Sequence, residues 1–219
     1  MKLFLDTANI EEIKRAKDWG ILDGVTTNPS HVAKEEQNFF DLVDEICELL
    51  PEGEISVEVT ATDYDGIVKE AQKIAGLHEN ILVKVPLIKE GIKAIATLSK
   101  QGIKVNTTLC FSASQALLAA KAGAYYISPF VGRLDYVSHD GMELIKQIRT
   151  IYDNYGFETG ILSAALRHPL HVLQSAIAGA EVATMKYEIM EMLFDHPQTD
   201  SGLQQFLEDW EGLGISILE

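Results

Sequence analysis

Several short apolar stretches of this sequence carry a polar residue of a type that enzymes use for catalysis. Lys84 lies in ILVKV, Glu58 in SVEVT, Asp6 at the end of KLFLD, and Asn106 and Thr108 in KVNTTL. Burial disfavours the protonated form of a lysine, and an uncharged amine attacks carbonyl groups to form imines. Carboxylates can then move protons, and hydroxyl and amide groups can hold water and substrate oxygens. The set therefore favours Schiff-base chemistry on Lys84.

These polar residues also share one face of the strands that surround them. Side chains alternate along a strand, so Lys84 lies on the face opposite Val83 and Val85. If the apolar faces meet outer helices, the polar ones point into a barrel, late in their strands, where (β/α)₈ enzymes hold their active sites. A structural ion network is the alternative for any one strand. Buried strand positions are normally apolar, and five polar residues that occupy such positions on the same face favour an active site.

Apolar stretches alternate with amphipathic ones along the whole chain, which is typical of βα units. We expect strands at 2–6, 22–27, 54–60, 80–84, 104–109, 125–128, 158–162 and 181–184. We expect helices at 9–19, 38–49, 64–76, 89–100, 112–122, 139–154, 168–178 and 186–212, the last broken at His196–Pro197. Left-handed helix ends are expected at Gly20, Gly102, Gly123 and Gly179.

Eight such units in 219 residues predict an α/β protein with the (β/α)₈ TIM-barrel fold and additional C-terminal helices. An open doubly wound sheet is the less favoured alternative. We expect a single domain, 1–219, with a C-terminal helical extension at about 186–219. The apolar residues of that extension are expected either to close the barrel or to dock on a neighbouring subunit.

The composition restricts the partners of the protein. A formal charge of −15 argues against binding to nucleic acid or to an anionic membrane, so any phosphate site must be local. No apolar run is long enough to span a membrane, and the start of the chain does not resemble a signal peptide, so we expect a cytoplasmic protein. Cys47 and Cys110 indicate neither disulfides nor zinc. His168 and His171 fit a helix start and packing better than a metal site, and no metal or cofactor is predicted.

Seven segments in order resemble the transaldolase family, particularly its short subfamily, which also contains fructose-6-phosphate aldolases. They are LDTANI at 5–10, GVTTNPS at 24–30, VEVTAT at 57–62, VKVP at 83–86, VNTTLCFSASQALLAA at 105–120, SPFVGRLD at 128–135 and LRHP at 166–169. The resemblance implies that Lys84 is the Schiff-base lysine and Asp6 the general acid/base at the substrate C4 hydroxyl. It implies that Glu58 and Thr108 position the water that moves protons to and from the carbinolamine and imine.

The resemblance also implies which residues bind the substrate. Asn28 and Asn106 would bind hydroxyls of the dihydroxyacetone portion, with Ser128 near its terminal hydroxyl. Arg133 and Arg167 would bind the phosphate, because a guanidinium offers paired donors to such an anion. Two alternatives remain open without the resemblance: Asn28 only shapes the turn before a proline, and Arg133 pairs with Asp135.

Two positions bear on the reaction itself. Aldolases of the subfamily resemble one another in having Gln and Tyr where this chain has Glu58 and Phe130, whereas transaldolases have Glu and Phe. We therefore predict a transaldolase of the pentose phosphate pathway, which transfers a dihydroxyacetone unit from sedoheptulose 7-phosphate or fructose 6-phosphate to an aldose phosphate. The alternatives are a fructose-6-phosphate or dihydroxyacetone aldolase and, less favoured, a non-catalytic sugar-phosphate-binding barrel.

The chain departs from the family pattern at two places. Ala165 stands where the family usually has Ser, which removes a donor to the phosphate, and Ser163 could compensate if the strand shifted. Lys186 stands where relatives often have Pro, and is expected to be an exposed residue at a helix start. The resemblance also implies a homo-oligomer, a pentamer or decamer.

Overall fold

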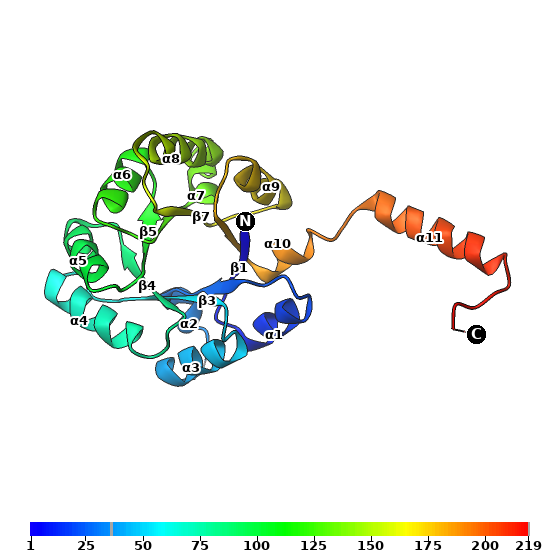
Figure 1. The fold of residues 1–219 in the computed structure, drawn as a ribbon, viewed down its shortest axis with the longest axis horizontal. Helices are drawn as coiled ribbons and strands as arrows, with labels where there is room; N and C mark the ends of the chain where they lie inside the picture. The colour runs from blue at the N-terminus through cyan, green and yellow to red at the C-terminus, as the bar shows by residue number, and fades with distance from the viewer. Residues whose placement is uncertain (36, 219) are drawn as a thin grey trace.

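Eight parallel strands close into a barrel in chain order, with β8 paired to β1 (Figure 1). The computed structural model describes residues 1–35 and 37–218. The strands are β1 (Lys2–Asp6), β2 (Gly24–Thr26), β3 (Glu54–Glu58), β4 (Ile81–Pro86), β5 (Val105–Cys110), β6 (Tyr126–Pro129), β7 (Gly160–Ser163) and β8 (Val182–Met185). The predicted (β/α)₈ barrel is confirmed.

Helices surround the barrel as the amphipathic pattern predicts. They are α1 (Ile10–Asp18), α3 (Phe39–Leu49), α4 (Tyr64–Ala75), α5 (Lys89–Lys100), α6 (Ala113–Lys121), α8 (Gly141–Tyr155), α9 (Pro169–Ile177) and α10 (Tyr187–Glu191). The last predicted helical segment also contains α11 (Pro197–Glu211), which lies outside this ring. Two short helices were not predicted, α2 (Pro29–Val32) and α7 (Val131–Asp135), because they are too short to show an amphipathic period. The four predicted glycine helix ends all have positive φ, between 71° and 86°.

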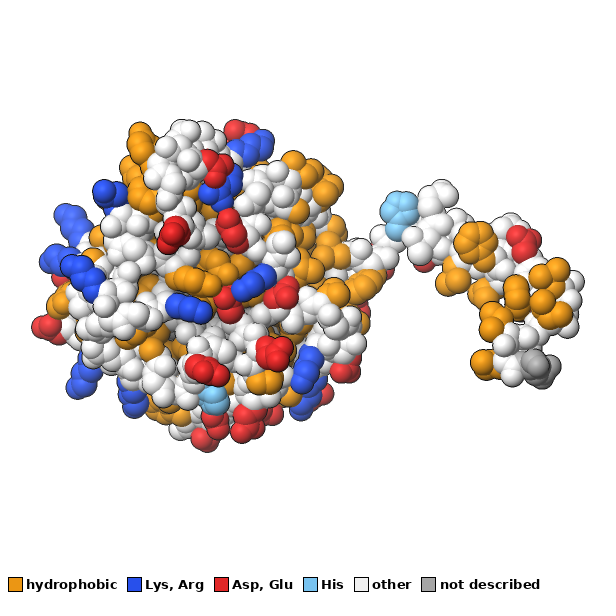
Figure 2. All heavy atoms as spheres, viewed as in Figure 1, with side chains coloured by type: hydrophobic (Ala, Val, Ile, Leu, Met, Phe, Trp, Pro, Cys, Tyr) orange, Lys and Arg blue, Asp and Glu red, His pale blue; other side chains and the backbone are white. Residues whose placement is uncertain are grey.

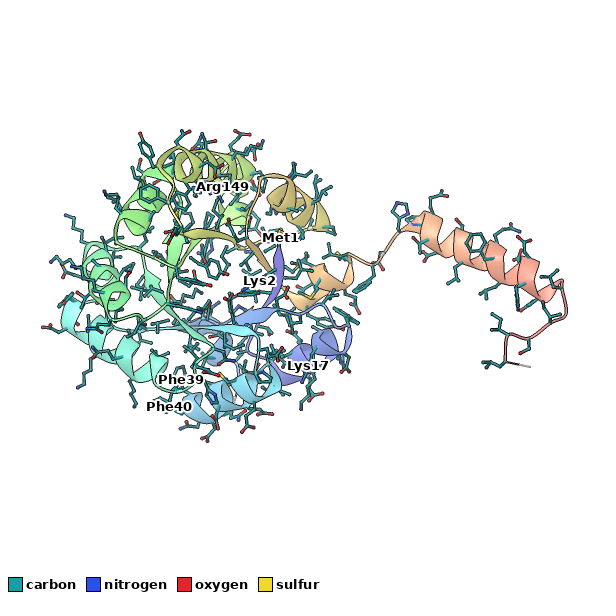
Figure 3. All side chains as sticks on the ribbon, in the orientation of Figure 1. Met1, Lys2, Lys17, Phe39, Phe40 and Arg149 are labelled. Carbon is teal, nitrogen blue, oxygen red and sulfur yellow. The ribbon has the colours of Figure 1, made fainter. Side chains whose placement is uncertain are left out.

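Alternation along the strands separates two apolar regions. Positions such as Leu5, Val57 and Val83 belong to the main core between the strands and the helices. The opposite positions form a smaller cluster inside the barrel: Phe4, Leu82, Tyr126, Leu162, Ala164 and Val182. Side chains fill the centre of the ring in Figure 3, where Lys2 lies at the start of β1 and its amine is 2.9 Å from Glu54. The interior is therefore plugged toward the N-terminal ends of the strands, which leaves the polar positions at the other end.

The C-terminal segment behaves in two ways. Helix α10 packs on β1 and buries Ile189 and Met190. Helix α11 projects away from the barrel and has no buried residue, so the expectation that this stretch closes the barrel is wrong for α11 (Figure 1). Apolar side chains nevertheless gather along it (Figure 2), among them Phe206 at 73% exposure. In residues 1–35 and 37–218, no helix has both the length and the apolar character needed to cross a membrane.

Candidate active site

A cavity of about 360 Å³ lies where the predicted polar side chains converge. Its lining includes the following predicted site residues: Asp6, Asn28, Glu58, Lys84, Thr108, Ser128, Phe130, Arg133 and Arg167. They come from the ends of β1, β3, β4, β5 and β6 and from the segments after β2, β6 and β7. The barrel thus brings together residues far apart in the sequence, at the end of the strands where this fold carries chemistry.

Lys84 lies at the buried floor of this cavity. Its side chain is 6% exposed, and its Nζ is 3.0 Å from Oε2 of Glu58 and donates to the carbonyl of Thr27 at 3.0 Å. Register places Glu58 beside it on β3 and Asn106 beside it on β5. An amine in this position has a carboxylate within direct reach to receive its proton.

Thr108 offers an unused hydroxyl beside the lysine strand. Its Oγ1 is buried and has no hydrogen-bond partner within the part of the chain that the structure describes. The strand is irregular here, since the register with β6 shifts between Thr107 and Cys110 and Leu109 has φ of 61°. Such bulges re-aim side chains next to active sites. The hydroxyl is therefore available to a water or a substrate oxygen.

Asp6 is held from one side of its carboxylate. Its Oδ1 accepts a hydrogen bond from Thr26 at 3.1 Å and lies 3.5 Å from Nε2 of His31. The Thr26 hydroxyl is also 2.6 Å from that of Thr184. Burial alone would raise the pKa of Asp6, but the close contact and charge of His31 and the charge of Lys84 outweigh it and hold the pKa below its ordinary value. Asp6 is therefore an ionised carboxylate suited to act as a base.

Asn106 lies behind the cavity wall. Its side chain is fully buried, where its Oδ1 accepts from the Ser128 hydroxyl at 2.6 Å and its Nδ2 donates to Ser56 at 3.1 Å. Ser128 itself lines the cavity. Asn106 therefore orients the Ser128 hydroxyl, and its contact with a substrate stays a prediction.

Two arginines line the cavity. The guanidinium carbon of Arg133 is 5.6 Å from the centre of the Phe130 ring, and that of Arg167 is 5.5 Å from the centre of the Tyr136 ring. Among the described residues, neither guanidinium forms an ion pair with a carboxylate, and Nε of Arg167 is buried without a partner. The alternative that Arg133 pairs with Asp135 is therefore wrong. Two guanidinium groups without a carboxylate partner in the described part of the chain can hold an anion locally, although the net charge of the chain is −15.

Asp135 instead supports the backbone around the second arginine. It accepts a hydrogen bond from the N–H of Gly141 and is 3.0 Å from Nε2 of His171. The other ring nitrogen of His171 accepts from the N–H of Arg167. Burial, then the nearby His168, lower the pKa of His171 despite Asp135. His168 precedes α9 as its N-cap residue, as expected for a helix start.

Comparison with known proteins agrees with this geometry. The Transaldolase/Fructose-6-phosphate aldolase family matches residues 3–217. The chain belongs to this family. It is 57% identical to a "Probable transaldolase" of Petrotoga mobilis, over 96% of this chain and 95% of the relative. A protein of the same printed name from Kosmotoga olearia is 55% identical over 96% of both chains, and one from Aquifex aeolicus is 55% identical over 96% of this chain and 97% of the relative.

Within this transaldolase-family barrel, Ala165 occupies an unusual backbone position. It lines the cavity and has φ of 57°, and its carbonyl accepts from the N–H of Gly132 at 3.2 Å. A Cβ at residue 132 would lie 2.5 Å from that carbonyl oxygen, so the close approach requires glycine. Ser163 is fully buried and accepts a hydrogen bond from Ser175 on α9. It faces the helix layer, so the expectation that Ser163 could replace the missing hydroxyl is wrong.

Several residues of the site were missed from the sequence. Thr26 and Thr184 form the hydroxyl pair beside Asp6, and His31 lines the cavity next to the same carboxylate. The threonines occupy inward positions of β2 and β8, so the alternation rule could have found them. His31 carried no strand signal because it lies on the unpredicted α2. Lys186 is exposed and precedes α10, as expected, but it also lines the cavity.

Proposed function

We propose that the protein is a transaldolase that moves a dihydroxyacetone unit from a ketose phosphate, sedoheptulose 7-phosphate or fructose 6-phosphate, to an aldose phosphate. The observation that carries the proposal is the buried amine of Lys84, 3.0 Å from the Glu58 carboxylate on the floor of the cavity. Membership in the family and the printed name of the close relatives support it. The reaction that we propose is one of the pentose phosphate pathway.

The first half of the reaction forms an imine. Lys84 gives its proton to Glu58, and its nitrogen then adds to the C2 carbonyl of the ketose to form a carbinolamine. A water held between Glu58 and the free Thr108 hydroxyl carries the protons that allow hydroxide to leave as water. The iminium that remains withdraws electrons from the neighbouring bonds.

The second half breaks and remakes a carbon–carbon bond. Asp6 takes the proton of the C4 hydroxyl, the C3–C4 bond breaks, and its electron pair moves into the iminium to give an enamine on Lys84. The aldose product leaves with its C4 oxygen as the aldehyde. An acceptor aldehyde then accepts the enamine carbon, Asp6 returns its proton to the new hydroxyl, and water releases the ketose product.

The remaining lining residues position the substrate in this scheme. Arg133 and Arg167 bind the phosphate of donor and acceptor, because both guanidinium groups face the cavity without an ion-pair partner among the described residues. Asn28 and Ser128 bind hydroxyls of the three-carbon unit, with Asn106 fixing Ser128 from behind. The side-chain oxygen of Asn28 also caps α2, so Asn28 can both bind substrate and shape the turn before Pro29.

Trapping the imine tests the chemistry. Borohydride reduction in the presence of fructose 6-phosphate, followed by peptide mass mapping, should place the adduct on Lys84. Lys84→Met is the matched control and should give no adduct. Active protein whose Lys84 remains unmodified would refute the mechanism, whereas protection by ligand without any imine or turnover would indicate a non-catalytic binding barrel.

The fate of the enamine separates transaldolase from aldolase. Phe130 has no hydroxyl to order water or deliver a proton to the enamine, which supports transfer over release. In an assay without acceptor aldehyde, we expect little free dihydroxyacetone, and addition of an aldose phosphate should restore turnover. Rapid release without acceptor would support the aldolase alternative.

We also propose that the protein is a cytoplasmic homo-oligomer in which α11 of one copy packs on another copy. Helix α11 exposes four large apolar side chains, each by 40% or more: Leu203, Phe206, Leu207 and Trp210. A helix of this length is stabilised mainly by burial of its apolar side chains, so α11 needs a partner surface. Family resemblance favours a pentamer or decamer. Light scattering coupled to size exclusion should give a larger mass for wild type than for the Phe206→Ser/Trp210→Ser variant. A monomeric wild-type chain would refute the proposal.

A further inference from the structure

The imidazole of His31 lies against the Asp6 carboxylate without being part of the barrel. His31 is the third residue of the short helix α2, which begins directly after β2. The side-chain oxygen of Asn28 accepts hydrogen bonds from the N–H groups of Ser30 and His31 at 2.9 and 3.0 Å. This cap fixes the backbone that carries the ring. The ring is mostly buried, with 18% of the side chain exposed.

His31 also forms part of the wall between two cavities. The second cavity, of about 200 Å³, adjoins the first, and Asp6, His31 and Lys186 line both. Its other lining residues are Thr7, Ala8, Asn9, Glu12, Lys34, Glu35 and Glu188. Asp6 therefore borders both spaces, and loss of the imidazole would expose its carboxylate further to the second, polar one.

The contacts of Asp6 divide its two oxygens. Oδ1 accepts from Thr26 and lies 3.5 Å from Nε2 of His31, whereas Oδ2 accepts no hydrogen bond within residues 1–35 and 37–218. Rotation of the carboxylate would exchange the two oxygens. The hydrogen bond from Thr26 is one restraint on this rotation. The imidazole supplies the second restraint, so Oδ2 stays free to accept a proton.

We propose that His31 is a positioning residue for Asp6, which holds the carboxylate ionised and oriented to take the proton of the substrate C4 hydroxyl. The proposal rests on the transaldolase function proposed above. Besides Asp6 and His31, the two cavities are lined by these charged groups: Glu58 on β3, Lys84 on β4, Arg133 on α7, Arg167 after β7, Glu12 on α1, Lys34 and Glu35 after α2, and Lys186 and Glu188 at the start of α10.

The direction of the Asp6 ionisation supports this role. Burial is the largest influence and raises the pKa of Asp6, and the 3.5 Å contact and the charge of His31 are the leading influences that lower it. The charge of Lys84 acts in the same direction but is smaller. The lowered pKa keeps Asp6 ionised, and His31 contributes to lowering it. The acid limb of the pH profile of kcat/KM should therefore depend on His31.

Three variants separate orientation from charge. His31→Leu removes both the N–H donor that orients Asp6 and the positive charge. His31→Gln retains an amide donor without the charge. Lys34→Met, which alters only the second cavity, is the matched control. We expect His31→Leu to lower kcat for transfer about tenfold or more, with a smaller change in KM for fructose 6-phosphate. The acid limb of kcat/KM should move up by about one pH unit, the lower end of the effect of a close opposite charge. His31→Gln should recover part of kcat with its acid limb still shifted, and Lys34→Met should match wild type.

Borohydride labelling distinguishes failure of this inference from failure of the proposed function. Every His31 variant should still label Lys84, because imine formation does not use Asp6. Wild-type kcat and an unmoved acid limb in both His31→Leu and His31→Gln would overturn the proposal, as would loss of Lys84 labelling in a folded His31→Gln protein. Absence of the adduct in wild-type protein would instead refute the Schiff-base function itself.

Discussion

Replacing Ala165 by Ser should strengthen the binding of phosphorylated substrates. Ala165 lines the cavity two residues before Arg167, and its backbone has φ of 57°. Alanine and serine both carry a Cβ, so the strain of this left-handed conformation, about 1–2 kcal/mol, is the same for both. The substitution therefore adds a hydroxyl without a new backbone penalty, and we expect the free energy of unfolding to change by less than about 0.5 kcal/mol.

The size of the effect follows from the kind of hydrogen bond that is added. A hydrogen bond to a charged group contributes about 1.5–3 kcal/mol. Ala165 is only partly buried, so water competes for the phosphate and the lower end applies. About 1.4 kcal/mol corresponds to a tenfold change in an equilibrium constant. We therefore expect kcat/KM for fructose 6-phosphate to rise about tenfold in Ala165→Ser.

The assay compares fructose 6-phosphate with fructose as donors to the same aldose phosphate. Only the ratio of their kcat/KM values reports on the donor phosphate, since fructose shares every other contact. Ala165→Gly is the matched control, because it removes the backbone strain without adding a donor, and its ratio should equal that of wild type. An unchanged ratio in Ala165→Ser, or an equal gain for both sugars, would refute the assignment of this wall of the cavity to the phosphate.

Three further predictions concern the chemistry and the core. Asp6→Asn should lower kcat for transfer by about 10²–10⁴-fold while borohydride still labels Lys84, and parallel loss of labelling would contradict its role in bond cleavage. Phe130→Tyr should raise the release of free dihydroxyacetone without acceptor, and an unchanged partition would count against proton delivery from that position. Burial raises the pKa of the Cys47 and Cys110 thiols to about 12 from 9.0, so the stability that they contribute is present below about pH 9 and falls as pH rises toward 12. The urea midpoint of the double Cys→Ala variant should therefore drop less over that range than that of wild type.

The order of elements and the direction of strand side chains were predictable from the sequence. Both depend on local periodicity: apolar and polar residues alternate with a period of two in ILVKV, and helices such as α4 show a wider apolar stripe. Lys84 and Glu58 could be recognised because a charged residue on a buried strand violates that pattern. The convergence of these side chains on one cavity followed once eight βα units predicted a closed barrel.

Residues outside regular strands were harder to assign. Helix α2 is four residues long, shorter than one amphipathic repeat, so no sequence pattern predicts that His31 lies beside Asp6. Ser163 looked like a neighbour of the phosphate site, yet the alternation of β7 turns it toward α9. Likewise, Arg133 does not pair with Asp135, because Asp135 contacts His171 and the Gly141 backbone instead.

The sequence by itself determined the barrel, the lysine and the carboxylates around it, because side-chain polarity and period are local properties of the chain. Only the tertiary structure decided which oxygen of Asp6 accepts the hydrogen bond of Thr26, which arginines have no carboxylate partner among the described residues, and where α11 points. Those features depend on contacts between segments far apart in the sequence, such as Asp6 with Thr26 and His31. Hydrogen bonds and ion pairs act over a few ångströms, so such contacts exist only after the chain has folded.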